Sequence, residues 1–133
     1  MKPRILIVDD DEAITQQLYW TLCDKYDVVT ANDLSTAIRR ATVYKPDVFI
    51  LDLQLPPEHD SPEVGMKLLK FIKGHIPNSH VLIMSSHVGF ETQKACYAAG
   101  ADEFFDKPFE IERLLATICR LVPFNHLELA RIV

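Results

Sequence analysis

The sequence predicts an α/β domain in which five parallel strands form one sheet with helices on both faces. Two observations predict this class. Short β-rich runs alternate with helical patterns five times along the 133 residues, with short connections between them, and such alternation is typical of parallel sheets. The first, third and fourth runs are apolar on both faces, as in strands that helices cover on each side.

The first half of the chain is expected to hold three strands and two helices. The first strand covers residues 4–8, and the helix after it has apolar residues four positions apart. A weaker strand at 26–30 and a helix at 34–44 follow. Pro46 prevents further helix, so the apolar run at 47–51 is expected to be the third strand.

The second half is expected to begin with a polar loop at 54–63. The loop contains three prolines, and no regular element fits there. The elements expected after it are a helix at 64–73, a strand at 80–84, a helix at 90–99 that Gly100 ends, a short strand at 103–105, and a last helix between Pro108 and Pro123. We expect one domain at residues 1–122, and a C-terminal tail or the start of a linker at 123–133.

The order of the strands follows from their connections. Crossovers between parallel strands are right-handed and place helices on both faces of the sheet. Of the two common doubly wound orders, a chain with five strands and five helices suits 2-1-3-4-5, the flavodoxin-like order. In such a sheet the reactive crevice lies beyond the carboxyl ends of the strands, so the residues there are the candidates for a site.

Polar residues follow four of the strands at that edge. They are Asp9 to Glu12 after strand one, Asp52 after strand three, Ser85 and Ser86 after strand four, and Asp106 to Pro108 after strand five. Clustered carboxylates repel one another unless a cation joins them, and their hard oxygens favour Mg²⁺ or Mn²⁺. A carboxylate can also become an aspartyl phosphate, whose oxygens a hydroxyl and an amine can bind. Taken singly, each residue also fits a plainer role at a helix N-terminus or in a turn.

Four stretches of the sequence carry a resemblance to a known family. They are residues 5–11, 47–56, 81–86 and 100–109, which contain the acids, the hydroxyl and the lysine at the strand ends. Together they resemble the response-regulator receiver domain of two-component signalling, and the likeness covers about residues 3–122. The family's fold is the one that the pattern of elements predicts.

The resemblance implies a role for each residue at this edge. Asp52 would accept a phosphoryl group, in a self-catalysed transfer and hydrolysis without turnover of an outside metabolite. Mg²⁺, or Mn²⁺ as an alternative, would be bound by Asp9, Asp10, Asp52 and the backbone carbonyl of Gln54. Lys107 would pair with Asp52 at rest and bind the phosphoryl group afterwards.

Further residues are assigned by the same resemblance. Ser85 would donate its hydroxyl to a phosphoryl oxygen. Phe104 stands where receivers carry a switch aromatic, often tyrosine, and an ordinary half-buried strand aromatic is the equal alternative. Gln54 and His87 would tune the lifetime of the phosphorylated state, although His87 also fits an exposed loop histidine. Asp11 is expected to cap the first helix rather than to bind metal.

The resemblance also implies partners. A histidine kinase or a phosphotransfer protein would donate the phosphoryl group, and an output domain or downstream protein would read the altered surface of the last strand and last two helices. That surface could also form a homodimer.

Two other functions stay open, namely a Mg²⁺-dependent phosphatase or phosphotransferase and a receiver-like interaction module that is never phosphorylated. Such enzymes carry an acid where Gln54 stands, and an amide cannot serve as a general acid. Retention of all the acceptor-site residues argues against the module.

Composition disfavours two other kinds of partner. The net charge is −5 and the basic residues are scattered, which disfavours direct nucleic-acid binding. No apolar run approaches the ~18 residues that a membrane helix needs. The apolar stretch near the N-terminus is short and ends in acids, unlike a signal peptide. We therefore expect a cytoplasmic protein.

The loop after the third strand departs from the family pattern. Gly65 lies 13 residues after Asp52, farther than the corresponding glycine of typical receivers, so Pro57 to Glu63 is interpreted as an insertion. Loop insertions cost little stability. The insertion would lie at the rim of the site, where it could contact a kinase or shield the phosphate, and a solvated loop without a function is the simpler interpretation.

Overall fold

The computed structural model describes residues 2–57, 61–86 and 89–122. Along these residues five strands alternate with five helices. The elements are β1 (Arg4–Val8), α1 (Glu12–Leu22), β2 (Asp27–Ala31), α2 (Leu34–Tyr44), β3 (Val48–Asp52), α3 (Glu63–His75), β4 (His80–Ser85), α4 (Phe90–Ala98), β5 (Glu103–Asp106) and α5 (Ile111–Leu121). The alternation predicted from the sequence is therefore present.

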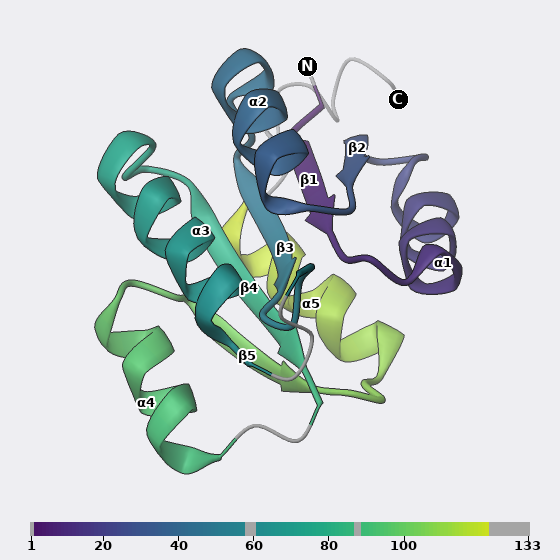
Figure 1. The fold of residues 1–133 in the computed structure, drawn as a ribbon. Coiled ribbons are helices and arrows are strands. Elements are labelled where there is room, and N and C mark those ends of the chain that lie inside the picture. The colour runs from purple at the N-terminus through teal and green to yellow at the C-terminus, as the bar shows by residue number, and fades with distance from the viewer. Residues whose placement is uncertain (1, 58–60, 87–88, 123–133) are drawn as a thin grey trace.

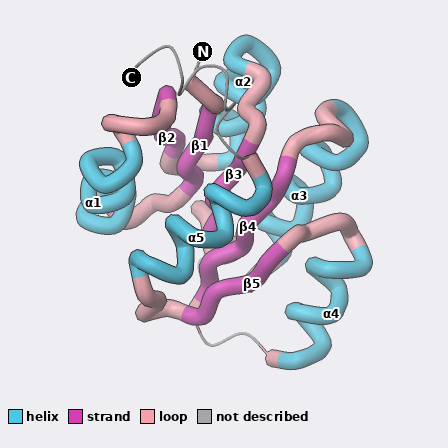
Figure 2. The backbone as a smooth tube through the Cα atoms, turned by 180° about the vertical axis from the view of Figure 1, so that it is seen from behind, coloured by secondary structure: helices cyan, strands magenta, loops and turns pink. Residues whose placement is uncertain are grey.

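The elements form three layers, with one sheet between two layers of helices (Figure 1). All strand pairs are parallel, and the order is β2-β1-β3-β4-β5. Helices α2, α3 and α4 lie on one face, and α1 and α5 lie on the other, which Figure 2 shows from behind. The predicted flavodoxin-like fold and its strand order are confirmed.

The strand ends differ by one residue from the prediction. β2 and β3 each begin and end one residue later than the expected ranges 26–30 and 47–51. The parallel ladder continues into the polar residues, since Asp52 pairs with Met84 and Ser85 pairs with Asp106. Both polar residues are therefore held by the sheet itself rather than by the loops beyond it.

Alternating strand side chains fill two cores, one on each face of the sheet. In β1, Ile5 and Ile7 belong to the core under α1 and α5, whereas Leu6 and Val8 belong to the core under α2, α3 and α4. All four side chains are fully buried, and burial of a side chain of this size stabilises the fold by about 2 kcal/mol. The two cores fix the sheet, and the sheet positions the residues at its carboxyl edge.

The helices are short and have identifiable ends. Asp11 caps α1 as predicted, because its carboxylate accepts a hydrogen bond from the N–H of Ala13 (3.0 Å). Asp33 caps α2 in the same way through the N–H of Thr36 (2.8 Å). Gly100 follows α4 with a φ of 108°, which glycine adopts without strain. The described helices span 9 to 13 residues, and none of them is long and apolar enough to cross a bilayer.

Gly65 lets the first turn of α3 pack directly on the chain just beyond β3. Its N–H donates to the carbonyl of Leu53 (3.1 Å), and a Cβ at this position would lie 2.3 Å from the Leu53 Cα. α3 begins at Glu63, inside the segment expected to be a loop, so the last residue of the predicted insertion belongs to the helix. Within that insertion, residues 58–60 lie outside the described part of the chain.

We expect Gly65→Ala to lower the free energy of unfolding by about 2–3 kcal/mol, because overpacking against a backbone cannot be relieved by a side-chain rotation. Urea-induced unfolding, followed by circular dichroism, measures this loss. The matched control is Gly74→Ala in the same helix, where an added Cβ meets no atom within 4 Å. There the higher helix propensity of alanine should raise stability by up to about 1 kcal/mol. Equal stability of Gly65→Ala and the wild type would contradict a tight contact.

Candidate functional site

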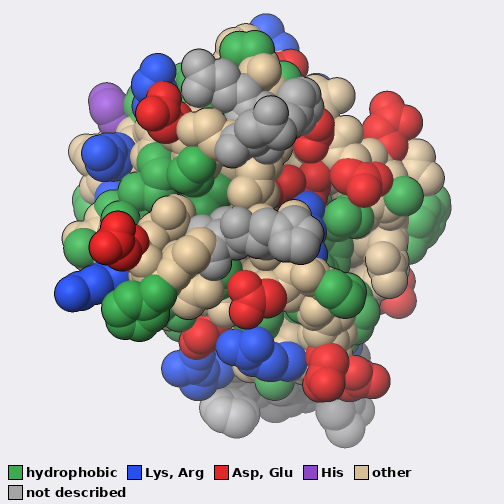
Figure 3. Space-filling view, turned by 60° about the horizontal axis from the view of Figure 1, so that its bottom comes forward, with side chains coloured by type: hydrophobic (Ala, Val, Ile, Leu, Met, Phe, Trp, Pro, Cys, Tyr) green, Lys and Arg blue, Asp and Glu red, His purple; other side chains and the backbone are tan. Residues whose placement is uncertain are grey.

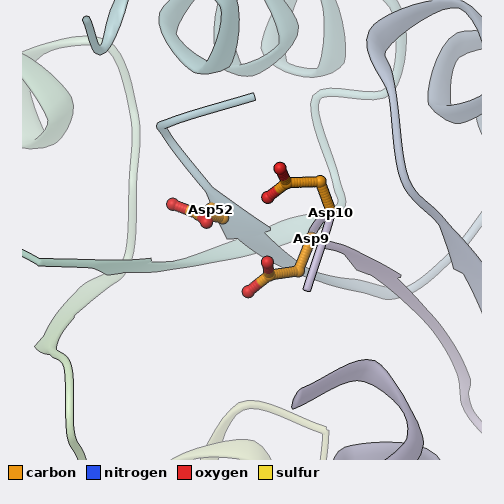
Figure 4. A group of neighbouring side chains, drawn as sticks. All are labelled: Asp9, Asp10 and Asp52. Carbon is orange, nitrogen blue, oxygen red and sulfur yellow. The ribbon is translucent and has the colours of Figure 1, made fainter. Parts of the chain in front are cut away.

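Three carboxylates meet where β1 and β3 end (Figure 4). Asp9 and Asp10 directly follow β1, Asp52 is the last residue of β3, and the two strands are neighbours in the sheet. Each of the three side chains offers an oxygen, and these oxygens lie within 4.8 Å of one another. Asp9 and Asp52 are buried, and Asp10 is partly exposed. The topology thus brings together acids that are 43 positions apart in the chain.

Lys107 neutralises part of this charge. Its Nζ donates to Oδ2 of Asp52 (3.0 Å) and to Oδ2 of Asp9 (2.8 Å). The pair with Asp52 is the one expected at rest, whereas nothing in the sequence predicts the pair with Asp9. Backbone N–H groups bind the remaining oxygens, since Oδ1 of Asp9 accepts from Asp11 (2.9 Å) and Oδ1 of Asp52 accepts from Gln54 (3.0 Å). Buried carboxylates need such partners.

The balance of charges shifts two pKa values. Burial raises the pKa of Asp52 to about 6, and the negative charge of Asp9 adds to this rise, while Lys107 and the N–H of Gln54 oppose it. Burial lowers the pKa of the Lys107 ammonium, but its hydrogen bonds and charge pairing with Asp9 and Asp52 outweigh that effect, so its pKa is raised. One lysine therefore does not fully compensate the acids, which is the electrostatic setting that a divalent cation fits.

We expect Asp52 to make stability depend on pH when divalent cations are absent. Its pKa in the folded protein is about 6, above the ordinary 3.8, so its contribution is fully present below the ordinary value and is lost as the pH rises through 6. Between about pH 7 and pH 5 the free energy of unfolding of the wild type should therefore rise by about 1 kcal/mol relative to that of Asp52→Asn. Urea unfolding of both proteins in chelator measures the difference. Parallel pH profiles would contradict the raised pKa.

Ser85 and Gln54 form a second contact at the same edge. Ser85 is fully buried at the end of β4, and its hydroxyl donates to Oε1 of Gln54 (2.6 Å). Nε2 of Gln54 donates to the backbone carbonyl of Ser86 (3.2 Å). Sequence reasoning assigned both residues to the site but missed their direct contact, because no pattern in the sequence shows which way a glutamine side chain turns.

Phe104 is more buried than a half-buried strand aromatic. Its side chain is 7% exposed and belongs to the core under α2, α3 and α4, whereas its neighbour Phe105 lies in the core on the other face. The short β5 thus has an aromatic residue on each side. His87, which the resemblance assigns together with Gln54 to the lifetime of the phosphorylated state, lies outside the described residues. The metal role of the Gln54 carbonyl stays a prediction.

The surface around the site is acidic. Figure 3 views the molecule toward the carboxyl ends of the strands, and several acidic side chains gather on one part of this face. Asp11 and Glu12, at the start of α1, are exposed. Such a surface attracts cations and repels free anions, which favours a cation at the three carboxylates.

Known proteins resemble this chain along most of its length. The family model of the response regulator receiver domain matches residues 5–119. The chain is 35% identical over 121 residues to transcriptional regulatory protein KdpE of Staphylococcus aureus, an alignment that covers 89% of this chain and 49% of that protein. It is 30% identical over 123 residues to response regulator MprA of Mycobacterium tuberculosis, covering 92% and 51%. The chain thus spans about half the length of these curated relatives.

Solved structures give the same result. The chain superposes on the BeF3-activated DrrB receiver domain with a TM-score of 0.81 and 27% identity, covering 91% of this chain and 97% of that one. The non-phosphorylated HemR receiver domain of Leptospira biflexa gives a TM-score of 0.81 at 30% identity, with coverage of 93% and 97%. Chemotaxis protein CheY4 of Vibrio cholerae gives 0.80 at 29%, with coverage of 92% and 100%.

Proposed function

The chain belongs to the response regulator receiver domain family, and from this premise we propose that it is a phosphorylation switch with Asp52 as its acceptor. Receiver domains of this family act in two-component systems, where they interact with histidine kinases and output domains. The observation that supports the acceptor assignment is the position of Asp52. Its buried carboxylate lies between Lys107 and the two acids that follow β1.

Asp52 would act as the nucleophile in phosphoryl transfer. A carboxylate oxygen forms a bond to phosphorus while the bond between phosphorus and the donor breaks, and the donor's leaving group keeps that electron pair. The N–H of Gln54 on Oδ1 and the ammonium of Lys107 on Oδ2 hold the carboxylate in one orientation, which lowers the entropic cost of attack. Water later attacks the same phosphorus, the bond from phosphorus to the Asp52 oxygen breaks, and inorganic phosphate leaves as the carboxylate is regenerated.

The three acids fit a divalent cation. Their hard oxygens lie close enough together to share one ion, and the choice of oxygen ligands favours Mg²⁺ or Mn²⁺ over softer metals. We propose Asp9, Asp10 and Asp52 as ligands, together with the backbone carbonyl of Gln54. When bound, the cation would supply positive charge to the carboxylates and to the phosphoryl oxygens.

Phosphorylation would change the surface through Lys107 and Ser85. The modification adds about −1.5 to −2 charge and three acceptor oxygens. Lys107 already contacts Asp52, and Ser85 directly follows Met84, the residue that pairs with Asp52 in the sheet. We propose that this pull on the ends of β4 and β5 alters the face formed by α4, β5 and α5. Phe104 lies buried beneath that face, so it is the aromatic that such a change would move.

The partners follow from the same function. A histidine kinase or a phosphotransfer protein would donate the phosphoryl group, and an output domain or a downstream protein would respond to the altered face. Homodimerisation through that face would be one form of response. An outside metabolite is not a substrate in this proposal, because Gln54, which stands where an aspartyl-phosphate enzyme needs an acid, carries an amide that contacts Ser85 and cannot donate a proton to a leaving group.

The function is tested by incubating the protein with acetyl phosphate, a small phosphodonor, in the presence of Mg²⁺. We expect intact-mass spectrometry to show an added mass of one phosphoryl group, because the site holds the nucleophile and its electrostatic partners. Excess chelator should prevent labelling, since the carboxylates would then repel the anionic donor. Mn²⁺ should restore labelling in place of Mg²⁺. Labelling that persists in chelator would contradict the metal role of Asp9 and Asp10.

A further inference from the structure

The side chain of Gln54 connects the end of β4 to the chain that follows β3. Its amide uses both of its polar atoms on one short segment, since Oε1 accepts from the hydroxyl of Ser85 (2.6 Å) and Nε2 donates to the carbonyl of Ser86 (3.2 Å). The backbone N–H of the same residue donates to Asp52 (3.0 Å). One residue therefore contacts both the phosphate acceptor and the hydroxyl that would bind the phosphoryl group.

The hydroxyl of Ser85 can satisfy only one acceptor at a time. A serine hydroxyl carries a single proton, so it donates one hydrogen bond. In this structure that proton is directed to Gln54, and the serine is fully buried, out of contact with water. A phosphoryl oxygen on Asp52 must therefore compete with the amide oxygen of Gln54 for the same donor.

We propose that the Gln54 side chain is a latch that holds Ser85 and the end of β4 in the unphosphorylated arrangement. The inference rests on the proposed function, since it assumes that Ser85 binds a phosphoryl oxygen. Release of the latch breaks the two hydrogen bonds of the amide, so the latch disfavours the switched arrangement relative to the unphosphorylated one. The cost of breaking these hydrogen bonds subtracts from the free energy of binding between the Ser85 hydroxyl and the phosphoryl group.

The latch is tested with beryllium trifluoride, a phosphoryl mimic that binds the aspartate carboxylate and is not hydrolysed as the phosphate is. Its affinity is measured by ¹⁹F NMR at a Mg²⁺ concentration that saturates each protein. Gln54→Met keeps the length of the side chain and removes both hydrogen-bonding atoms. We expect it to bind the mimic about fivefold to tenfold more tightly than the wild type. Water replaces part of the two hydrogen bonds that the wild-type amide loses on release, and the remaining cost of about one net hydrogen bond corresponds to about a fivefold change in affinity.

The Ser85→Ala background provides the matched control. Without the hydroxyl, Gln54 keeps only its hydrogen bond to the Ser86 carbonyl, so Gln54→Met should give a clearly smaller gain in affinity there than in the wild-type background. Gln54→Ala, checked for folding by circular dichroism, is a second variant that also removes the latch. Unchanged or weaker binding by both Gln54 variants would overturn the latch, as would a gain of the same size with and without the Ser85 hydroxyl. A wild type that fails to bind the mimic at all would instead overturn the proposed function, and the latch with it.

Discussion

Asp52→Asn is expected to reduce labelling by acetyl phosphate about 100-fold or more, to the level seen without donor, because an amide oxygen is not a nucleophile at neutral pH. The substitution keeps the shape of the side chain. The amide oxygen can still accept the hydrogen bond that the N–H of Gln54 makes with Asp52. Intact-mass spectrometry after a fixed incubation with Mg²⁺ measures the labelled fraction of both proteins.

A neighbouring aspartate provides the control for this loss. Asp106 ends β5 at the same edge of the sheet, but it is exposed and lies outside the cluster of three acids. Asp106→Asn should therefore be labelled like the wild type. Equal labelling of Asp52→Asn and the wild type would show that another residue is the acceptor. Peptide mapping of the labelled protein would then identify that residue.

The convergence of the site could be predicted because it depends on topology rather than on side-chain detail. Once the strand order is 2-1-3-4-5, residues after β1, β3, β4 and β5 must share one edge, whatever their conformations. This is why Asp9, Asp52, Ser85 and Lys107 were placed together from the sequence. Their position within the strands is harder to predict, because a parallel ladder can extend by one residue into a polar end, as it does at Asp52 and Ser85.

The contacts between individual side chains could not be predicted in the same way. Lys107 reaches Asp9 as well as Asp52, and Gln54 turns toward Ser85 rather than toward solvent. The rotamers of these two side chains depend on neighbours that are distant in sequence. The burial of Phe104 has a similar origin, because α3 and α4 cover a strand whose own pattern indicated only a partly buried face.

Lys107→Met is expected to lower the free energy of unfolding by about 2–3 kcal/mol in chelator at a pH of about 8. Removing one member of a buried ion pair leaves its partners uncompensated, and here two buried carboxylates, Asp9 and Asp52, lose their shared ammonium. Methionine keeps most of the length of lysine, so the loss reports charge rather than a cavity. Urea unfolding of both proteins measures it.

Mg²⁺ separates this electrostatic account from a loss of packing. A bound cation replaces positive charge at the same carboxylates, and a ligand that binds only the folded state stabilises it, so Mg²⁺ should stabilise Lys107→Met more than it stabilises the wild type. Lys70→Ala, at an exposed position of α3, should stay within about 0.5 kcal/mol of the wild type under both conditions. If Lys107→Met is as stable as the wild type in chelator, then the ammonium does not stabilise the acids of the resting site.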